Sequence, residues 1–294
     1  MVSILIPTYN YNVYPLVMEL KKQADLANIE YEIIILDDAS SISIQENLAI
    51  NDFKKCLYLI NDSNLGRANN INKLIGLSKF DYCLILDCDV FPKKDDFLSN
   101  YIIELFSKKD VVYGGIAYKS ELPLQKEMLR WTYGHKREAI AFEKRIKNPY
   151  QYLLTSNILI CKSKLENNFF NKDIINYGYE DLEFVKKLEA KKISVSNIKN
   201  EVYHLNLETS SEFLQKTEKA LQNLYFLEKT GILPRKSTKV SKLHSILKQI
   251  YLDRLVTKIY PFTKSILKQN LLSKNPNLFI FDVYKILFYC KISK

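Results

Sequence analysis

The sequence predicts an α/β fold built around a sheet of mainly parallel strands, followed by a basic helical extension at the C-terminus. Over the first 120 residues, short apolar runs rich in β-branched and aromatic residues alternate with helix-like stretches, as is typical of βαβ units with right-handed crossovers. The positive charge is confined to the end of the chain: residues 235–294 hold 13 Lys and Arg but only two acidic residues, whereas residues 1–234 hold 30 basic and 31 acidic groups. We therefore expect a neutral α/β body and a cationic appendage.

The first half of the predicted body comprises residues 1–118. Strands are predicted at 2–6, 31–36, 56–60, 82–86 and 111–113, with helices near 13–26, 43–51, 66–79 and 94–107. Polar residues follow several of these strands directly: Thr8-Tyr9-Asn10, Asp37-Asp38, Asn61-Asp62 and Asp87-Cys88-Asp89. Ligands of such sheets bind beyond the carboxyl ends of the strands, so this edge is the predicted site.

The second half of the predicted body comprises residues 119–234. Its charged segment 119–150 is predicted to be helical, followed by a strand at 153–161, a helix near 179–191, a strand ending at 205 and a long helix near 208–229. The character of the sequence changes after a Gly-Ile-Leu-Pro stretch, and we expect a domain boundary at 234/235. The tail, 235–294, contains two further helix-like segments, 243–255 and 277–290.

Composition excludes several classes of protein. With 294 residues, 47 % of them hydrophobic, and only seven glycines, the chain is a globular protein and not a collagen-like or low-complexity one. Its five cysteines form no CxxC pair, which favours reduced thiols in a cytoplasmic protein. No apolar run approaches 18 residues, and the chain begins directly in a predicted strand, so we expect neither a membrane span nor a signal peptide.

Two aspartates spaced by one residue end the strand at 82–86. Side chains two residues apart on an extended strand share a face, and Asp87 and Asp89 are then roughly 6.5–7 Å apart along the chain. Two carboxylates this close repel each other unless a cation lies between them, and oxygen ligands suit Mg²⁺ or Mn²⁺. The alternative is a strand end with two solvated aspartates.

Five segments together resemble family 2 glycosyltransferases, which are nucleotide-sugar-dependent enzymes with the GT-A fold, a Rossmann-like nucleotide-binding domain with a mixed sheet. In chain order they are SILIPTYN (3–10), ILDDAS (35–40), NLGRANNIN (64–72), LDCDVF (86–91) and YGYEDLEF (177–184). The resemblance covers roughly residues 1–230. The Gly-x-Glu-Asp segment and a downstream histidine resemble the galactosyltransferase-like and chondroitin-polymerase-like members of the family.

The resemblance implies a nucleotide-binding half in residues 1–118, an acceptor-binding and catalytic half in residues 119–234, and a site for a UDP-sugar. Its nucleotide-sugar-binding residues are Pro7, Tyr9, Asp38, Arg67, Asn72, Asp87 and Cys88. Pro7 and Tyr9 would line the uracil pocket, with the tyrosine ring against the base. Asp38 would accept a hydrogen bond from the uracil edge, and Arg67 would meet the diphosphate or the base.

The resemblance also implies a divalent cation, Mn²⁺ or Mg²⁺, held by Asp89 with Asp87 and His204. Asp87 corresponds to a ribose- or metal-contacting aspartate and Asp89 to a direct metal ligand. His204 lies at the end of the predicted strand that ends at 205, and a neutral imidazole is a good ligand for Mn²⁺. The alternative for a lone histidine at a strand end is a surface or capping role.

Asp181 is expected to be the catalytic base, and Glu180 to orient the substrate. Acidic residues are favoured in any first helical turn, which is the alternative explanation for this pair. In the family, the aspartate takes a proton from the acceptor hydroxyl, which attacks the anomeric carbon in line and inverts it. Tyr177 and Tyr179 stand where tryptophan is frequent in the family, which leaves the acceptor preference open.

Two further features resemble parts of the substrate site. Thr155-Ser156-Asn157 resembles the segment that faces the donor sugar and the acceptor in the family. Trp131, in the charged segment, either stacks on an acceptor sugar or anchors its helix; the sequence does not distinguish these roles.

The tail predicts contact with an anionic membrane surface. Its segment 243–255 has helical amphipathicity with Lys and Arg between the apolar positions, and 277–290 is strongly apolar but too short to span a bilayer. The segment at 277–290 is therefore expected to act as an interfacial anchor. The alternative is that the tail packs on the body or on a second subunit. No nucleic-acid-binding motif accompanies the charge, so no nucleic-acid partner is expected.

These observations favour an inverting transferase that moves a sugar from a UDP-sugar to a hydroxyl of a glycan or lipid-linked oligosaccharide in bacterial polysaccharide synthesis. Galactose or N-acetylgalactosamine is favoured on the resemblance alone. We expect a cytoplasmic protein, peripheral on the inner face of the cell membrane, and allow for a homo-oligomer. Two alternatives stay open: a nucleotidyltransferase, whose glycine-rich N-terminal loop is missing here, and a non-catalytic, membrane-associated nucleotide-binding or scaffold protein of the same fold.

Overall fold

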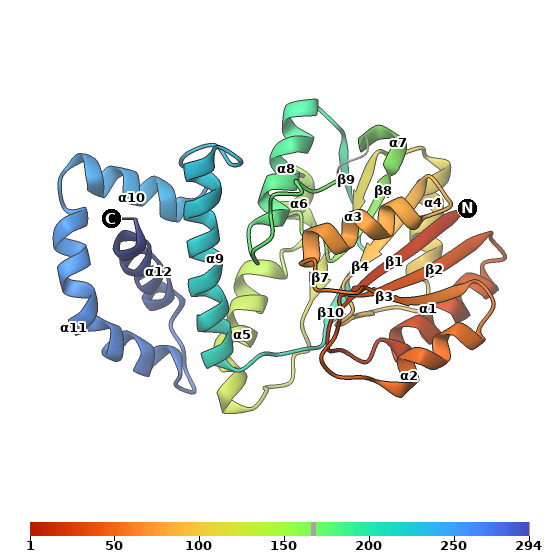
Figure 1. Ribbon diagram of the computed structural model, residues 1–294, viewed down its shortest axis with the longest axis horizontal. Helices are drawn as coiled ribbons and strands as arrows, with labels where there is room; N and C mark the ends of the chain where they lie inside the picture. The colour runs from red at the N-terminus through yellow and green to blue at the C-terminus, as the bar shows by residue number, and fades with distance from the viewer. Residues whose placement is uncertain (166–168, 294) are drawn as a thin grey trace. The chain divides into compact units, whose positions relative to one another are not determined.

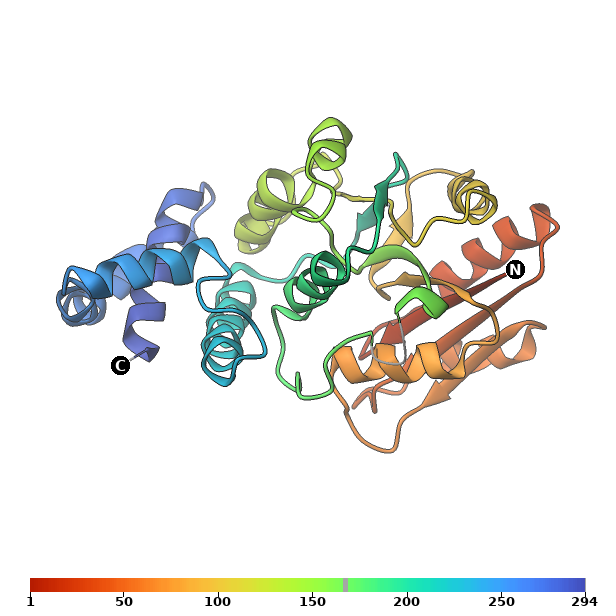
Figure 2. The same cartoon turned by 90° about the horizontal axis from the view of Figure 1, so that it is seen from above.

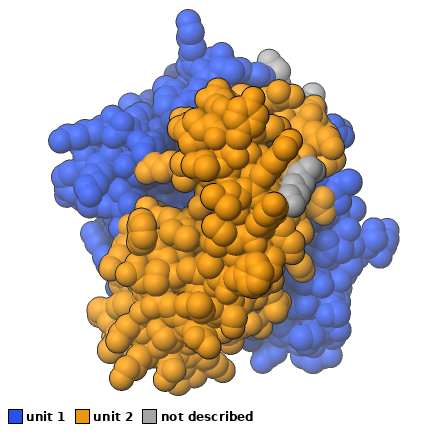
Figure 3. Space-filling view, turned by 90° about the vertical axis from the view of Figure 1, so that its left-hand side faces the viewer, with its two compact units in different colours: residues 1–119, 138–175, 180–206 blue, residues 120–137, 176–179, 207–294 orange. Residues whose placement is uncertain are grey.

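A computed structural model describes residues 1–165 and 169–293 of the chain (Figures 1 and 2). The chain forms two compact units, which are coloured separately in Figure 3. Unit 1 comprises residues 1–119, 138–175 and 180–206, and unit 2 comprises residues 120–137, 176–179 and 207–294.

Unit 1 carries the strands of the fold. Its strands are β1 (Val2–Thr8), β2 (Tyr31–Asp37), β3 (Cys56–Ile60), β4 (Tyr82–Leu86), β5 (Val90–Pro92), β6 (Val111–Tyr113), β7 (Ile116–Ala117), β8 (Asn157–Cys161), β9 (Val195–Asn197) and β10 (Val202–His204). Its helices are α1 (Tyr14–Leu26), α2 (Gln45–Leu48) with a 3₁₀ turn at Ala49–Asp52, α3 (Arg67–Leu77), α4 (Phe97–Phe106), α6 (Phe142–Lys147), α7 (Lys162–Leu165) and α8 (Glu180–Lys191). The alternation of strands and helices up to β6 confirms the predicted α/β organisation.

The large sheet has the strand order β3-β2-β1-β4-β8-β6-β9. Strands β1 to β4 are parallel, β8 runs antiparallel to both β4 and β6, and β9 is parallel to β6, so the sheet is mixed. A small second sheet has the order β5-β10-β7. The sequence predicted two of the three-residue strands, β6 and β10, but not β5, β7 or β9, which have two or three residues each.

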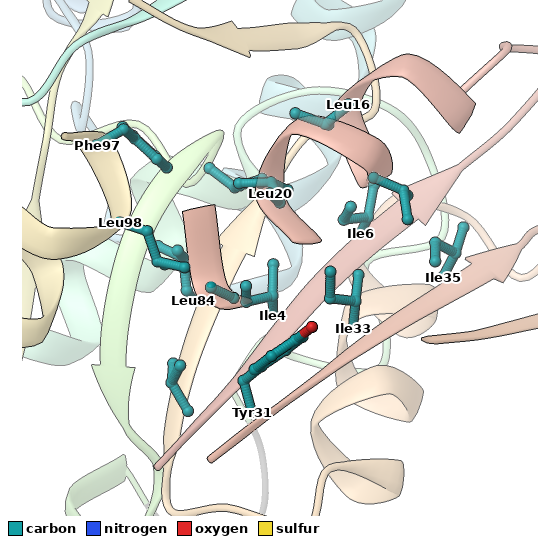
Figure 4. Packing of buried hydrophobic residues seen from close by; sticks show 14 of the residues in the cluster. Ile4, Ile6, Leu16, Leu20, Tyr31, Ile33, Ile35, Leu84, Phe97 and Leu98 are labelled. Carbon is teal, nitrogen blue, oxygen red and sulfur yellow. The ribbon is translucent and has the colours of Figure 1, made fainter. Parts of the chain in front are cut away.

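The two faces of the parallel strands are covered by different helices. Residues of α1 and α4 join alternate residues of β1, β2 and β4 in one buried cluster, while α3 packs on β1 from the other face (Figure 2). In Figure 4, Ile4 and Ile33 from adjacent strands lie close to Leu20 of α1, and all three side chains are fully buried. Burying an aliphatic side chain of this size contributes about 1.5–3 kcal/mol. This core holds the strand ends that carry the candidate site.

The strand predicted at 153–161 is shorter in the structure. Only Asn157–Cys161 is extended, as β8, and a turn at residues 155–156 comes directly before it. The side chain of Asn157 explains where the strand begins. It is fully buried and its amide donates to the backbone oxygens of Gly115 and Asn200 at 2.8 and 2.9 Å, which fixes its position between two other segments.

Unit 2 is helical in the part that the structure describes. It contains a 3₁₀ turn (Gln125–Glu127), α5 (Met128–Tyr133), α9 (Ser210–Thr230), α10 (Lys239–Gln249), α11 (Asp253–Leu271) and α12 (Leu278–Ile292); a π-helical turn, Gly134–Glu138, follows α5. The predicted helix near 208–229 is confirmed as α9. A reciprocal capping box between Thr209 and Glu212 begins α9, and Gly231, with φ of 82°, ends it.

Helix α12 packs against α9, α10 and α11, and Figure 1 shows α12 between α9 and α11. The rings of Phe281 and Phe213 stack at 5.7 Å, and the Tyr284 hydroxyl donates to Glu218. Segment 277–290 was expected to be an interfacial anchor, and this is wrong for most of its apolar side chains. They form the interior of unit 2. A helix with apolar side chains on nearly all sides is more stable when neighbouring helices cover several of those sides than when one side alone is covered.

The amphipathic segment 243–255 is not one helix. Helix α10 ends at Gln249, and Tyr251, with φ of 60°, turns the chain into α11. Neither glycine nor proline marks this turn, so the sequence pattern gave no signal for it. In the part of the chain that the structure describes, no helix is both long and apolar enough to cross a bilayer.

Candidate active site

The carboxyl ends of the strands and the start of α8 bring charged side chains of unit 1 together. Asp87 follows β4, Arg67 begins α3, and Thr155 lies in the turn before β8. Glu180 and Asp181 are the first two residues of α8. These five residues come from four separate stretches of sequence, and they meet around the guanidinium group of Arg67.

Arg67 contacts the other four side chains of this group. Its Nε and Nη2 donate to Oδ1 of Asp87 at 3.2 and 2.7 Å. Its Nη1 and Nη2 both donate to the hydroxyl oxygen of Thr155 at 3.0 Å. Nη1 also lies 3.5 Å from Oδ1 of Asp181 and 3.8 Å from Oε1 of Glu180. We call these five residues the Arg67 cluster.

The electrostatics of the Arg67 cluster favour a second cation. Burial by itself lowers the pKa of an arginine, but the carboxylates of Asp87, Asp181 and Glu180 raise the pKa of Arg67 above its ordinary value. The guanidinium is therefore always charged, and its planar fork matches several acceptors at once. The three carboxylates of the cluster nevertheless carry more negative charge than one arginine can balance, so a second cation beside them would be stabilised.

Asp181 has a carboxylate suited to accept a proton. Burial raises the pKa of Asp181, and this outweighs the opposing effects of Arg67 and of the Thr155 hydroxyl, which donates a hydrogen bond to Oδ1. A raised pKa makes a carboxylate a stronger base, provided that the pH stays above it. Glu180 beside it is buried, with 7 % of its surface exposed.

Asp89 and His204 form a second pair in unit 1. Strand β5 begins just after Asp89 and pairs antiparallel with β10, with Val90 opposite His204. The Leu205 backbone N–H donates to the carbonyl oxygen of Asp89 at 2.8 Å, and Oδ2 of Asp89 lies 3.5 Å from Nε2 of His204. The ring of Tyr118 stacks on the His204 ring at 5.4 Å.

The donor types of this pair fit a divalent cation, although the described residues contain no cluster of three or more His, Cys, Asp or Glu side chains arranged to hold one. The carboxylate of Asp89 and the imidazole of His204 are ligands that Mn²⁺ accepts, and substrate phosphates commonly complete such sites. The third predicted ligand, Asp87, is bonded to Arg67 instead. Two of the three predicted ligands therefore lie together.

The negative charge of the aspartates raises the pKa of two neighbouring side chains. Burial, Asp89 and Cys88 raise the pKa of Tyr11 to about 12. Burial, and then the carboxylates of Asp89 and Asp87, also raise the pKa of Cys88 well above its ordinary value. Cys88 is thus a neutral thiol and brings no charge to the aspartates that flank it.

Asp38 organises the loop before α3. Its Oδ1 accepts hydrogen bonds from the Leu65 N–H at 2.8 Å and the Asn61 amide at 2.9 Å, and its Oδ2 accepts from the Gly66 N–H at 2.9 Å. Gly66 has φ of +79°, and a Cβ there would lie 2.9 Å from the Ile175 carbonyl oxygen. Asp38, which is 4 % exposed, therefore fixes the loop that presents Arg67.

The other predicted nucleotide-binding residues differ in exposure. Pro7 is buried within β1, whereas Tyr9 just beyond β1 is 50 % exposed, so its ring is available to a ligand. Asn72 forms a reciprocal pair with the backbone of Phe170: its amide donates to the Phe170 oxygen and its Oδ1 accepts from the Phe170 N–H, both at 2.9 Å. Asn72 thus holds the chain after α7 in this structure.

Sequence reasoning missed the roles of several residues. Thr155 was placed near the sugar and not against Asp181, and no local pattern indicates a contact between residues 26 positions apart. Tyr11 and Tyr118 had no motif to indicate them. In unit 2, the ring of Trp131 lies 4.2 Å from that of His135, so Trp131 has a contact within its own helical segment.

Comparison with solved structures shows a shared fold. The crystal structure of S. aureus TarS 1–349 matches with a TM-score of 0.52 and 16 % identity, over 99 % of this chain and 90 % of that chain. The same protein in complex with UDP-GlcNAc matches with a TM-score of 0.50 and 15 % identity over the same shares. A longer TarS structure matches over 97 % of this chain and 54 % of its own, with a TM-score of 0.51 and 15 % identity.

Comparison with curated protein sequences gives no match. The family described as "Glycosyl transferase family 2" matches residues 3–168, which is more than half of the chain. Those residues contain the strand ends that carry Asp38, Asp87 and Asp89, and the start of α3 at Arg67. The mixed sheet is that of the GT-A fold. The chain belongs to glycosyl transferase family 2.

Proposed function

We propose that the protein is a metal-dependent, inverting transferase that moves a sugar from a UDP-sugar to a hydroxyl of a glycan or lipid-linked oligosaccharide. The observation that carries this proposal is the Arg67 cluster. Arg67 bonds Asp87, the proposed donor-site aspartate, and lies 3.5 Å from Asp181, the proposed base. Donor binding and proton removal would therefore take place around one guanidinium group.

The uracil base is proposed to stack on Tyr9 beside Pro7. The ring of Tyr9 is half exposed, and stacking would cover it. Asp38 is proposed to accept a hydrogen bond from the edge of the base, with a carboxylate lone pair that the hydrogen bonds to the loop do not use. Asn72 and Cys88 are also proposed to bind the nucleotide-sugar. Arg67 is proposed to bind the diphosphate, for which its planar fork is well suited.

Asp89 and His204 are proposed to hold Mn²⁺ or Mg²⁺, with Asp87 as a third ligand or a ribose contact. When bound, such an ion neutralises the charge that develops on UDP as the sugar leaves. Asp89 and His204 are already held together by the pairing of β5 with β10, so little rearrangement is needed to present both. The arrangement of Asp87 would change most, because Arg67 now bonds it.

Asp181 is proposed to take the proton from the acceptor hydroxyl as that oxygen attacks the anomeric carbon. The nascent bond to the acceptor forms while the bond to the diphosphate oxygen breaks, so the configuration inverts and an α-linked donor gives a β-glycoside. Glu180 is proposed to orient the acceptor. Support comes from the raised pKa of Asp181, which favours a base over a spectator carboxylate.

The identity of the sugar is proposed from the Gly-x-Glu-Asp segment, Gly178 to Asp181, which favours galactose or N-acetylgalactosamine. A TarS structure matched by this chain contains UDP-GlcNAc, so that donor belongs in the same panel. UDP-galactose, UDP-N-acetylgalactosamine and UDP-GlcNAc differ at C4 and in the N-acetyl group. Comparing their rates of hydrolysis therefore separates the effect of the configuration at C4 from the effect of the N-acetyl group.

We propose residues 1–234 as the catalytic domain, with 1–118 binding the nucleotide and 119–234 binding the acceptor, and residues 235–294 as a tail. The protein is proposed to act in the cytoplasm at the inner face of the membrane, without a nucleic-acid partner. A homo-oligomer would be compatible with this function. Analytical ultracentrifugation measures the oligomeric state.

The decisive variant is Asp181→Asn, which keeps the shape of the side chain and removes the base. We expect transfer to fall by at least about 100-fold, because general-base catalysis contributes about that much or more. UDP binding, measured by calorimetry with Mn²⁺ and with EDTA, should persist in the variant and depend on the metal. Unchanged turnover would reject Asp181 as the base. UDP binding without turnover of any donor by the wild-type protein would favour a non-catalytic nucleotide-binding protein.

A further inference from the structure

Helix α11 exposes a continuous apolar face. Its outward apolar residues, which we call the α11 stripe, are spaced by four, three and four positions: Leu255, Ile259, Phe262 and Ile266, exposed by 53, 41, 82 and 67 %. This spacing places all four on one side of the helix. The opposite side is already packed, since Tyr260 lies against Tyr284 and Phe288 of α12 at ring distances of 6.3 and 6.2 Å.

Helix α10 continues the apolar surface up to the turn before α11. Leu243, Ile246 and Ile250, which we call the α10 stripe, are 44, 53 and 55 % exposed. Tyr251 at the turn is 80 % exposed. Side chains of this size are not usually exposed in a row on two successive helices, and such a surface marks an interaction site.

The same two helices are strongly basic. Between residues 239 and 271 there are seven Lys and Arg and one acidic residue, Asp253. Arg254 and Lys258, beside the α11 stripe, are exposed, as are three lysines on α10: Lys239, Lys242 and Lys248. Lys264 and Lys268 point elsewhere, because they lie 3.8 and 3.9 Å from Glu218.

We propose that the α10 and α11 stripes dock on the surface of an anionic phospholipid bilayer. The apolar side chains would enter the boundary between headgroups and acyl chains, and the exposed Lys and Arg would meet lipid phosphates. This proposal does not depend on the transfer chemistry. It also moves the membrane contact from α12, whose apolar residues are largely buried in unit 2, to the two helices before it.

Charge decides between a lipid surface and a second copy of the chain. A two-fold interface places the same patch of both copies together, so the cations beside the stripes would face one another with one aspartate on each side to compensate. Like charges in such an interface repel. A bilayer with anionic lipids instead supplies negative charge and an apolar phase in the same place.

The test uses the full-length chain and sedimentation with lipid vesicles. Vesicles of phosphatidylglycerol and phosphatidylcholine are compared with vesicles of phosphatidylcholine alone, each at low and high salt. We expect binding to the anionic vesicles, weakened by salt, because each Lys or Arg near such a surface contributes roughly fivefold in affinity. Absence of binding to anionic vesicles at low salt would overturn the proposal.

Two variants test the assignment to α11. Phe262→Gln with Ile266→Gln removes the most exposed part of the stripe, and Arg254→Glu with Lys258→Glu reverses two charges. We expect each pair to lower the partition coefficient at least tenfold. The matched control is Phe106→Gln, at a phenylalanine on α4 that is 81 % exposed, and it should bind like the wild type. Circular dichroism checks that the variants fold.

Two results would contradict the proposal in favour of another partner. If the wild-type chain sediments as a dimer without lipid and Phe262→Gln with Ile266→Gln makes it a monomer, the stripe is an interface between copies. If the charge variant loses binding to duplex DNA while neither pair of changes affects vesicle binding, the basic surface serves nucleic acid.

Discussion

Arg67 links the two halves of the proposed reaction, because it bonds Asp87 and lies near Asp181. Replacing Arg67 by Met keeps much of its length and removes its charge. We expect turnover to fall by at least about 100-fold, a loss of about 2.7 kcal/mol or more, which is typical of removing a preorganised electrostatic group from an active site. Steady-state kinetics with a UDP-sugar measure this loss.

Arg67→Lys is the matched control, because lysine keeps the positive charge but lacks the planar, forked guanidinium group. A lysine keeps the positive charge but donates from a single point, so it cannot bond Asp87 and Thr155 with the same geometry. We expect an intermediate rate. If Arg67→Met has the activity of the wild type, the guanidinium of Arg67 has no part in turnover.

Thr155 is expected to set the pH at which Asp181 works. Its hydroxyl donates to Asp181 and lowers the pKa of that carboxyl, while burial raises it. A base acts only when deprotonated, so the rate falls as the pH drops through the pKa of Asp181. Thr155→Val removes the donor, and we expect the acid limb of the profile of kcat/KM against pH to move to higher pH.

Thr155→Ser keeps the hydroxyl and should leave the acid limb near that of the wild type. A purely structural role would lower the rate at every pH without moving the limb. An unmoved limb in Thr155→Val would therefore contradict the assignment of Thr155 to Asp181.

At the scale of elements, Arg145 on α6 joins segments that are far apart in the sequence. It is 1 % exposed and donates to the backbone oxygens of Tyr113 at the end of β6, at 3.3 Å, and of Ile198 after β9, at 3.0 Å. It also bonds Glu201 at 3.1 Å. Arg145→Met takes its donor away from the Ile198 oxygen and from Glu201, while the Tyr113 oxygen keeps the Ile198 N–H at 3.1 Å. We expect the free energy of unfolding to fall by about 3 kcal/mol.

Urea denaturation measures that change, and Lys144→Met is the matched control on the same helix. Lys144 is exposed, so its replacement should alter the stability by no more than about 0.5 kcal/mol. Equal stabilities of the two variants would show that the contacts of Arg145 do not hold α6 to the sheet.

The elements differ in how far the sequence predicts them. Strands β1 to β4 have five to seven residues with clear apolar runs, and all four were predicted. Strand β5 has three residues and exists because β10 pairs with it. That pairing joins Asp89 to His204 across more than 100 positions, so His204 could be suggested as a second metal ligand by resemblance but not by local pattern.

For the whole molecule, the sequence predicts where charged and apolar residues lie along the chain better than it predicts which of them face solvent. The excess of Lys and Arg after residue 234 is evident from composition, and so is an apolar segment at 277–290. Hydropathy cannot tell whether an apolar helix faces solvent or three neighbouring helices. The structure buries Phe281, Tyr284 and Phe288 of α12 and leaves Phe262 of α11 exposed.

The stability of the whole chain is expected to report donor binding. UDP with Mn²⁺ is expected to bind the folded chain and not the unfolded one, and a ligand at 100 times its Kd stabilises by about 2.7 kcal/mol. For a chain of this size the melting temperature should rise by roughly 5 °C. All residues proposed to bind the nucleotide and the metal lie in unit 1. A single shifted transition would therefore mean that the two units unfold together, whereas one shifted and one unshifted transition would mean that they unfold separately.

The metal dependence of this shift tests Asp89 and His204 together. Their proposed ligand role requires that EDTA remove most of the stabilisation by UDP, and that His204→Ala respond to UDP with Mn²⁺ as the wild type does in EDTA. Differential scanning calorimetry measures both. An equal rise with and without metal would contradict the proposed metal site while leaving the nucleotide site intact, because the proposed contacts of UDP with Tyr9 and Arg67 do not require the metal. A chain that UDP does not stabilise under either condition would contradict both sites.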